Sequence, residues 1–97
     1  MERARAIEIL QSRATEAQGL GATALYIFGS TARDEAGERS DVDMFVDCDP
    51  ERFSFVELIR LQENLSQALG RPADLTTRRA LHPALKERIE REAIRVF

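Results

Sequence analysis

The chain has 97 residues, 43% of them hydrophobic, with 14 Lys and Arg against 17 Asp and Glu and a formal net charge of -3. This composition predicts one globular domain over residues 1–97, and its mild acidity argues against tight nucleic-acid binding by the chain itself. A single cysteine excludes an internal disulfide, and neither a membrane-length apolar stretch nor a secretory signal pattern is present, so we expect a cytoplasmic protein without a membrane partner.

The first half of the chain predicts one helix and two strands. Apolar residues at helical spacing predict a helix over residues 2–18, which the following glycines end. The apolar run 22–28 predicts a strand buried on both faces, ended by Gly29-Ser30. Residues 40–48 predict a second strand whose alternate side chains share a face: Val42, Met44 and Val46 on one, and Asp41, Asp43, Phe45 and Asp47 on the other.

The second half predicts a long helix, a short strand and a final helix. The pattern Ser54-x-x-Glu57 is a capping box, and Gly70 is the expected end of the helix that it starts. Residues 71–77 predict a third strand, and His82-Pro83 marks the start of a helical pattern that reaches Val96. The order α-β-β-α-β-α predicts an α+β fold, with a small mixed three-stranded sheet flanked by helices.

Two aspartates on the second strand form a candidate metal site. Asp41 and Asp43 are two residues apart, so their carboxylates lie on the same side of the strand and repel each other. A divalent cation that binds both removes this repulsion, and such oxygen ligands suit Mg²⁺ or Mn²⁺. An isolated Asp-x-Asp is more often a solvated strand face, so this pair needs support from elsewhere in the chain.

Three further features provide that support. Gly29-Ser30 follows a buried strand, where backbone amides and a hydroxyl can bind a phosphate. Arg33 lies one short turn further on and could bind the same anion as a forked donor. Asp74 is a carboxylate in a short apolar strand, a costly position unless it is exposed, paired or bound to metal. Taken singly, these residues also fit a tight turn, a solvated arginine and an edge aspartate. Together they indicate a phosphate-binding turn beside three carboxylates.

These residues resemble a known family. Gly29-Ser30, ten intervening residues and then Asp41-Val42-Asp43 are similar to the GSx10DxD motif of the DNA polymerase β-like nucleotidyltransferase superfamily. The segment FGSTARDEAGERSDVDMFVD resembles the minimal nucleotidyltransferases, called MNT or MntA-type proteins, as do the segments PADLTT and LHPALKERIEREAIRVF. The resemblance therefore extends over nearly the whole chain. One position departs from the pattern, because Asp34 follows Arg33 where glycine is expected.

The resemblance implies a nucleotidyltransferase fold and a role for each motif residue. The reaction would transfer AMP from ATP to a hydroxyl group and release pyrophosphate, with two Mg²⁺ ions bound to the triphosphate. Asp41 and Asp43 would hold the metal ions, and Asp74 would complete the metal site and help to deprotonate the attacking hydroxyl. Gly29 and Ser30 would bind the β- and γ-phosphates.

The acceptor must come from another molecule, because a chain of this length has no room for an acceptor domain. The resemblance implies a HEPN-domain toxin as partner, which the chain would neutralise as antitoxin by transferring AMP to a tyrosine. One alternative is a non-catalytic antitoxin that acts by binding alone. Another is a nucleotidyltransferase with a small-molecule or RNA acceptor. The exposed edges of so small a sheet also favour a homo- or hetero-oligomer.

Overall fold

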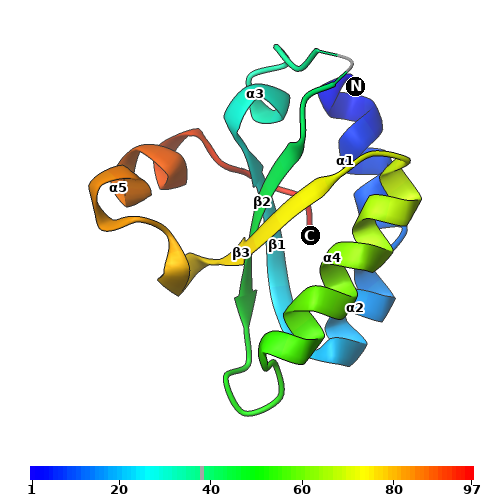
Figure 1. The fold of residues 1–97 in the computed structure, drawn as a ribbon, viewed down its shortest axis with the longest axis vertical. Helices are drawn as coiled ribbons and strands as arrows, with labels where there is room; N and C mark the ends of the chain where they lie inside the picture. Colours follow the sequence, from blue (N-terminus) through cyan, green and yellow to red (C-terminus); the bar gives the residue numbers. More distant parts are fainter. Residues whose placement is uncertain (38) are drawn as a thin grey trace.

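The computed structural model describes residues 1–37 and 39–97, and its centre is a mixed four-stranded sheet in the order β3-β2-β1-β4 (Figure 1). The central pair is antiparallel, β4 pairs antiparallel with β1, and β3 pairs parallel with β2. The α+β class and the mixed sheet are thus as predicted, with one strand more. The strands are β1 (Ala22–Phe28), β2 (Val42–Cys48), β3 (Ala73–Thr77) and β4 (Ile94–Arg95).

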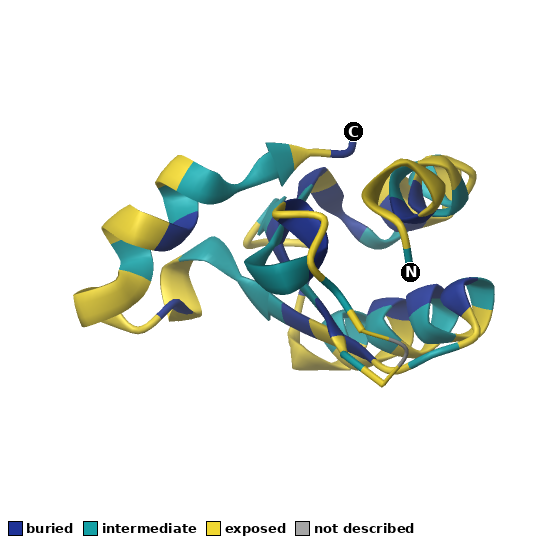
Figure 2. Ribbon diagram, turned by 90° about the horizontal axis from the view of Figure 1, so that it is seen from above, coloured by how far each residue is buried: buried dark blue, intermediate teal, exposed yellow. Residues whose placement is uncertain are grey.

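Helices cover both faces of this sheet. Figures 1 and 2 place α1, α2 and α4 on one side of the strands and α5 on the other. Two short elements, α3 and η1, directly follow β1 and β3. Within the described residues, no helix is long and apolar enough to cross a membrane. The helices are α1 (Arg3–Gln11), α2 (Ala14–Leu20), α3 (Gly29–Ala32), α4 (Phe55–Leu69), η1 (Arg78–Ala80) and α5 (Pro83–Glu92).

The main core lies between the sheet and the side covered by α1, α2 and α4. The predicted apolar face of β2 (Val42, Met44 and Val46) is fully buried there. The opposite face of β2 is less polar than predicted, because Phe45 is also fully buried. Its ring packs in a second, smaller cluster with Leu81 and with Ile89 of α5. The alternation of β2 is therefore correct, but α5 covers part of the face expected to be polar.

Two other predictions are wrong in detail. The helix predicted over residues 2–18 is broken into α1 and α2. At the break the Arg13 amide donates three residues back, to the Leu10 carbonyl at 3.0 Å, and the Ser12 hydroxyl donates to the Ile9 carbonyl, so the turn is tighter than an α-helical one. The final helix does not reach Val96 but ends at Glu92. The next residues form β4, where the Val96 amide donates to the Leu25 carbonyl at 2.7 Å. Satisfying the open edge of β1 outweighs the local helical pattern.

Helix α4 both follows its predicted signals and protects a sheet edge. Its capping box is present, and its C-cap Gly70 has the left-handed conformation, with φ of 69°. At the outer edge of β3, the amide of Ala73 donates to Ser66 Oγ and that of Leu75 to Gln62 Oε1, both at 3.0 Å. Side chains of α4 therefore take the place of a further strand.

Candidate active site

The strand register brings two of the three predicted carboxylates side by side. Asp43 of β2 and Asp74 of β3 are directly paired in the parallel ladder. On the other side of Asp43, its partner in β1 is Phe28, the residue before Gly29. The turn after β1 and these two aspartates thus form one row across the sheet, although Gly29 and Asp74 are 45 positions apart in the sequence.

Gly29 fits this row because it has no side chain. Its φ of 70° lies in the left-handed region, and a Cβ added to it would be 2.6 Å from Asp43 Oδ2. Any other residue would be strained and would also displace the carboxylate. The turn predicted to bind phosphate and the carboxylate predicted to bind metal therefore lie against each other.

Burial and the charges of neighbouring residues disfavour the ionised form of Asp43. Partial burial raises the pKa of its carboxyl, and the negative charges of Asp74 and Asp41 raise that pKa further. Arg33 acts in the opposite direction, while Glu92 adds to the rise. The fold therefore keeps several like charges around a half-buried carboxylate, which disfavours its ionised form.

These charges fit a divalent cation in chemistry, although the side chains are not arranged as a finished site. Carboxylate oxygens are the ligands that Mg²⁺ prefers, and a cation would relieve the repulsion around Asp43. Asp43 and Asp74 are the pair that the register joins, whereas Asp41 lies just before β2. In the part of the chain that the structure describes, no group of three or more acidic, His or Cys side chains is close enough to hold a metal.

The predicted phosphate ligand Arg33 contacts an acid that sequence reasoning missed. Its Nη1 is 3.0 Å from Glu92 Oε2, and its Nε is 3.2 Å from Glu35 Oε2. The other oxygen of Glu92 accepts the amide N–H of Gly29 at 3.0 Å. Glu92 lies in a tail of mixed charge, 63 residues from Gly29, so no local pattern distinguishes it. Only the docking of α5 brings it to the turn.

The departure from the family pattern at Asp34 is accommodated in the turn. Asp34 has φ of 60°, the conformation that glycine adopts most easily and that aspartate tolerates better than most residues. Its Oδ1 accepts the amide N–H of Arg3, at the start of α1, at 2.9 Å. Ser30 is half-buried, and its carbonyl accepts the Glu35 amide at 2.8 Å. Asp34 therefore adopts a left-handed conformation without glycine, and its side chain ties the turn to α1.

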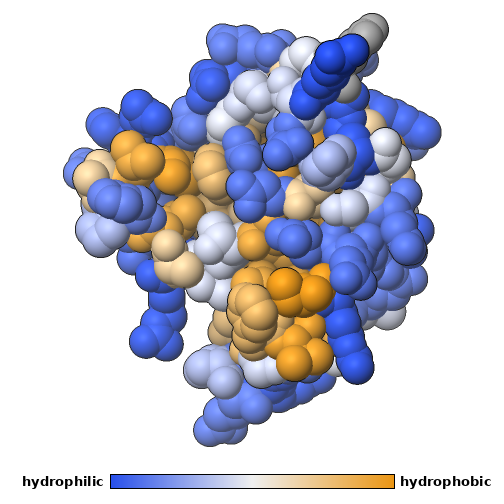
Figure 3. All heavy atoms as spheres, in the orientation of Figure 1, coloured by the Kyte–Doolittle hydropathy of each residue, from blue (hydrophilic) through white to orange (hydrophobic). Residues whose placement is uncertain are grey.

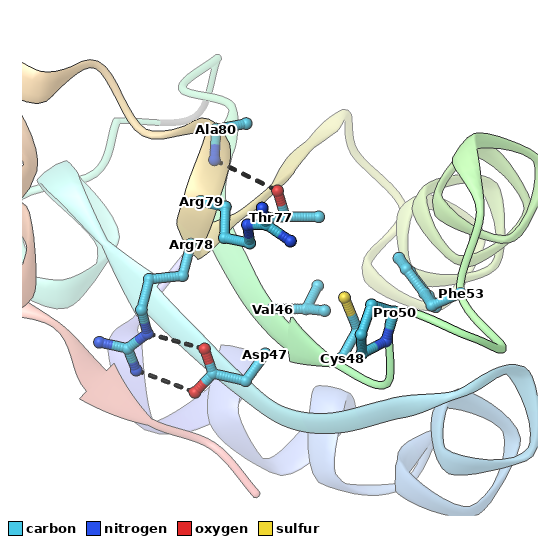
Figure 4. Close-up of a pocket in the computed structure, with 9 residues that line it drawn as sticks. All are labelled: Val46, Asp47, Cys48, Pro50, Phe53, Thr77, Arg78, Arg79 and Ala80. Atoms are coloured by element: carbon cyan, nitrogen blue, oxygen red, sulfur yellow. Dashed lines mark hydrogen bonds and ion pairs between the residues drawn. The ribbon is translucent and has the colours of Figure 1, made fainter.

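A second polar cluster lies further along β2. Arg78 binds both oxygens of Asp47, with its Nε at 2.7 Å and its Nη2 at 2.9 Å, and its Nη1 is 2.6 Å from Glu90 (Figure 4 shows the bond to Asp47). The guanidinium also lies over the stacked rings of Tyr26 and Phe45, at 4.9 and 4.8 Å from their centroids. We call these five residues the Arg78 clamp. It joins β1, β2, η1 and α5.

Two adjoining hollows lie near the last residues of β2 and β3, whereas the acidic row (Asp43 and Asp74) lies near the first residues of these strands. The larger, of about 640 Å³, includes Cys48, Arg79 and the clamp residues Asp47 and Arg78 (Figure 4). The smaller, of about 410 Å³, lies between α4 and the end of β3. None of the predicted site residues lines either hollow. Beside them, Figure 3 shows an apolar area near the start of α4, where Phe55, Val56 and Ile59 are exposed.

Comparison with known proteins identifies the family. The family described as "Nucleotidyltransferase domain" matches residues 5–96. A Methanocaldococcus jannaschii protein named as a protein adenylyltransferase is 44% identical over 71 residues, which are 73% of this chain and 75% of that protein. Protein adenylyltransferase MntA of Thermococcus cleftensis is 37% identical over 76 residues, covering 78% of this chain and 76% of that protein.

Solved structures give the same result. A minimal nucleotidyltransferase, 37% identical, superposes with a TM-score of 0.75 over 97% of this chain and 95% of its own. A chain of a toxin–antitoxin structure with AMP-PNP, 18% identical, has a TM-score of 0.72 over 90% of this chain and 72% of its own. A chain of a complex between an AMPylated Shewanella oneidensis HEPN toxin and its MNT antitoxin, 16% identical, reaches 0.65 over 94% and 71%. The last two show the shared fold. The chain is an enzyme that belongs to the nucleotidyltransferase domain family, which confirms the resemblance of its sequence to the minimal, MntA-type members.

Proposed function

We propose that the protein transfers AMP from ATP to a hydroxyl group of a partner protein, with Mg²⁺ bound by aspartates of β2 and β3. The observation that carries this proposal is the row formed by Gly29, Asp43 and Asp74. A glycine turn in contact with a carboxylate, itself paired with a second carboxylate, suits a triphosphate that bridges backbone amides and metal ions. A single domain over residues 1–97 would contain this whole site.

The proposal gives a role to each of the predicted site residues. Asp41, Asp43 and Asp74 would hold the cation, which neutralises charge on the phosphates and lowers the pKa of the attacking hydroxyl. Asp74 is exposed at the edge of the row, where it can also accept the proton of an entering hydroxyl. Gly29 and Ser30 would orient the β- and γ-phosphates, so that pyrophosphate leaves in line with attack at the α-phosphorus.

We further propose that the partner is a HEPN-type toxin and that the transfer, to a tyrosine, makes this protein an antitoxin. Support comes from the relatives named protein adenylyltransferase and from solved structures with a similar fold. One neighbour is a toxin–antitoxin structure with AMP-PNP, and another contains an AMPylated HEPN toxin with its MNT antitoxin. Asp74 is exposed, so an acceptor on a separate chain can reach this part of the site.

The decisive test is label transfer from ATP labelled at the α-phosphate, with Mg²⁺ and the candidate partner. Asp43→Asn and Asp74→Asn should each reduce transfer by about 1,000-fold, because each removes a metal-binding charge. Asp49→Asn is a matched control beyond the other end of β2, where the side chain accepts the Glu51 amide, a role that Asn can retain. Transfer that persists in folded Asp43→Asn would refute the site assignment.

A binding antitoxin without turnover is the second candidate. The exposed apolar side chains Phe55, Val56 and Ile59 lie beside the hollows, away from the acidic row, and such a surface is typical of protein contacts. This candidate predicts that Asp43→Asn still binds and neutralises the partner, whereas Phe55→Ser does not. The catalytic proposal predicts the opposite for neutralisation by Asp43→Asn.

A further inference from the structure

We propose that the carboxylate of Glu92 competes with the nucleotide's phosphate for the donors of the Gly29 turn, and so sets the affinity for nucleotide. This inference rests on the proposed function, because it takes the turn to be the phosphate site. It adds a residue of α5 to a site otherwise built from the turn after β1 and from the aspartates.

The first argument is the identity of the contacts. One oxygen of Glu92 accepts the Gly29 amide N–H at 3.0 Å, and the other lies 3.0 Å from Arg33 Nη1. These are two of the groups assigned to phosphate binding. A carboxylate and a phosphate are both oxyanions with the same preference for amide and guanidinium donors. Because an amide has a single N–H, Gly29 cannot serve both well.

The second argument is charge. Glu92 is close enough to Asp43 to add to the negative potential there, so it would also repel an incoming triphosphate. It is the last residue of α5, where the helix dipole disfavours a negative side chain. Its side chain is nevertheless only 23% exposed. The contacts with Gly29 and Arg33 therefore compensate for an unfavourable position, and phosphate would remove that compensation.

The third argument is that the carboxylate can leave without α5. The helix is fixed independently by Ile89, which packs against Phe45, and by the ion pair between Glu90 and Arg78. Glu92 also has three side-chain torsions, so a change of rotamer is enough to release the turn. Phosphate binding then exchanges one set of charge-assisted hydrogen bonds for another, at a cost in affinity.

The test measures direct binding of Mg²⁺-ATP to the full chain by calorimetry, with Glu92→Ala and Glu92→Gln. Glu92→Ala removes the competitor and should bind about tenfold more tightly than the unmodified chain. Glu92→Gln keeps an acceptor for Gly29 but loses the negative charge, so its gain should be smaller. KM for ATP should fall in the same order.

Glu87→Gln is the matched control, because it removes the same charge from an exposed position on the same helix and leaves the Glu90–Arg78 ion pair intact. It should leave ATP affinity within about twofold. If Glu92→Gln folds and binds ATP no more tightly, or more weakly, than the unmodified chain, Glu92 merely shapes the turn and the inference is wrong. If the unmodified chain does not bind ATP, the proposed function fails and the inference fails with it. Should Glu92→Ala not fold, Glu92→Gln decides.

Discussion

Asp43 and Asp47 are four residues apart on the same strand and the same face of β2, yet their surroundings are opposite. Asp47 accepts two hydrogen bonds from Arg78, which also stacks on aromatic rings. Asp43 instead lies opposite Asp74 and in contact with a glycine turn. The fold pairs the negative charge of Asp47 with a cation, whereas it places other negative charges beside Asp43. This difference fits a structural role for Asp47 and supports the proposal that Asp43 binds a cation.

Removing Arg78, which binds Asp47, should have the largest effect on stability. Arg78→Ala leaves Asp47 and Glu90 without their shared cation and uncovers the rings beneath it, so we expect a loss of about 2 kcal/mol in the free energy of unfolding. The groups are partly exposed, which keeps the loss below that of a fully buried pair. Urea unfolding measures it. Arg79→Ala, an exposed neighbour, is the control, and an equal effect of both variants would contradict a specific clamp.

The second-largest loss of stability should come from adding a side chain at Gly29, beside Asp43. Gly29→Ala places a methyl group 2.6 Å from Asp43 Oδ2 and strains a residue with φ of 70°, so we expect a loss of about 1–2 kcal/mol together with a loss of label transfer. Gly70→Ala separates the two causes, because Gly70 has φ of 69° but nothing within 4 Å of an added Cβ. The loss in Gly29→Ala beyond that in Gly70→Ala measures the contact with Asp43. Equal losses would mean that the contact has no cost.

The smallest expected effects are changes in Tm of opposite sign when Asp43 or Asp47 is replaced by asparagine. The pKa of Asp43 is raised in the folded protein, so its charged form opposes folding above that pKa and costs nothing where both states are protonated, below the ordinary value of 3.8. Asp43→Asn should therefore raise Tm by a few degrees near pH 7, roughly what a gain below 1 kcal/mol gives, and the gain should vanish as the pH falls below about 4. Asp47→Asn should lower Tm near pH 7. A fall of Tm in both would refute the comparison.

Much of the fold follows from local sequence. Gly29, Gly70 and the Ser54 capping box occupy the turns and ends that their chemistry favours, and the alternation in β2 gives its buried face. The sequence places Asp41 and Asp43 on one predicted strand and Asp74 on another, but the direct pairing of Asp43 with Asp74 emerges only from the strand register. The gathering of all three into one ligand cluster was expected, but the described side chains do not show it.

The remaining features depend on contacts between distant segments. Phe45 is buried because α5 folds over it, and β4 forms because β1 has an edge to fill. Glu92 reaches Gly29 only after α5 has docked. In each case the local pattern permits several outcomes, and tertiary packing selects one. Residues that act through such contacts carry no signal that a single sequence can reveal.

The side chains of Gln62 and Ser66, which bind the β3 amides, restrict how another chain can attach. An incoming strand would have to displace both before it could extend the sheet, so these side chains oppose aggregation through this edge. A protein that docked here would have to contact surface side chains, because the β3 backbone is not open for pairing. Surface substitutions alone could then change which protein docks, while the sheet that carries Asp43 and Asp74 stays unchanged.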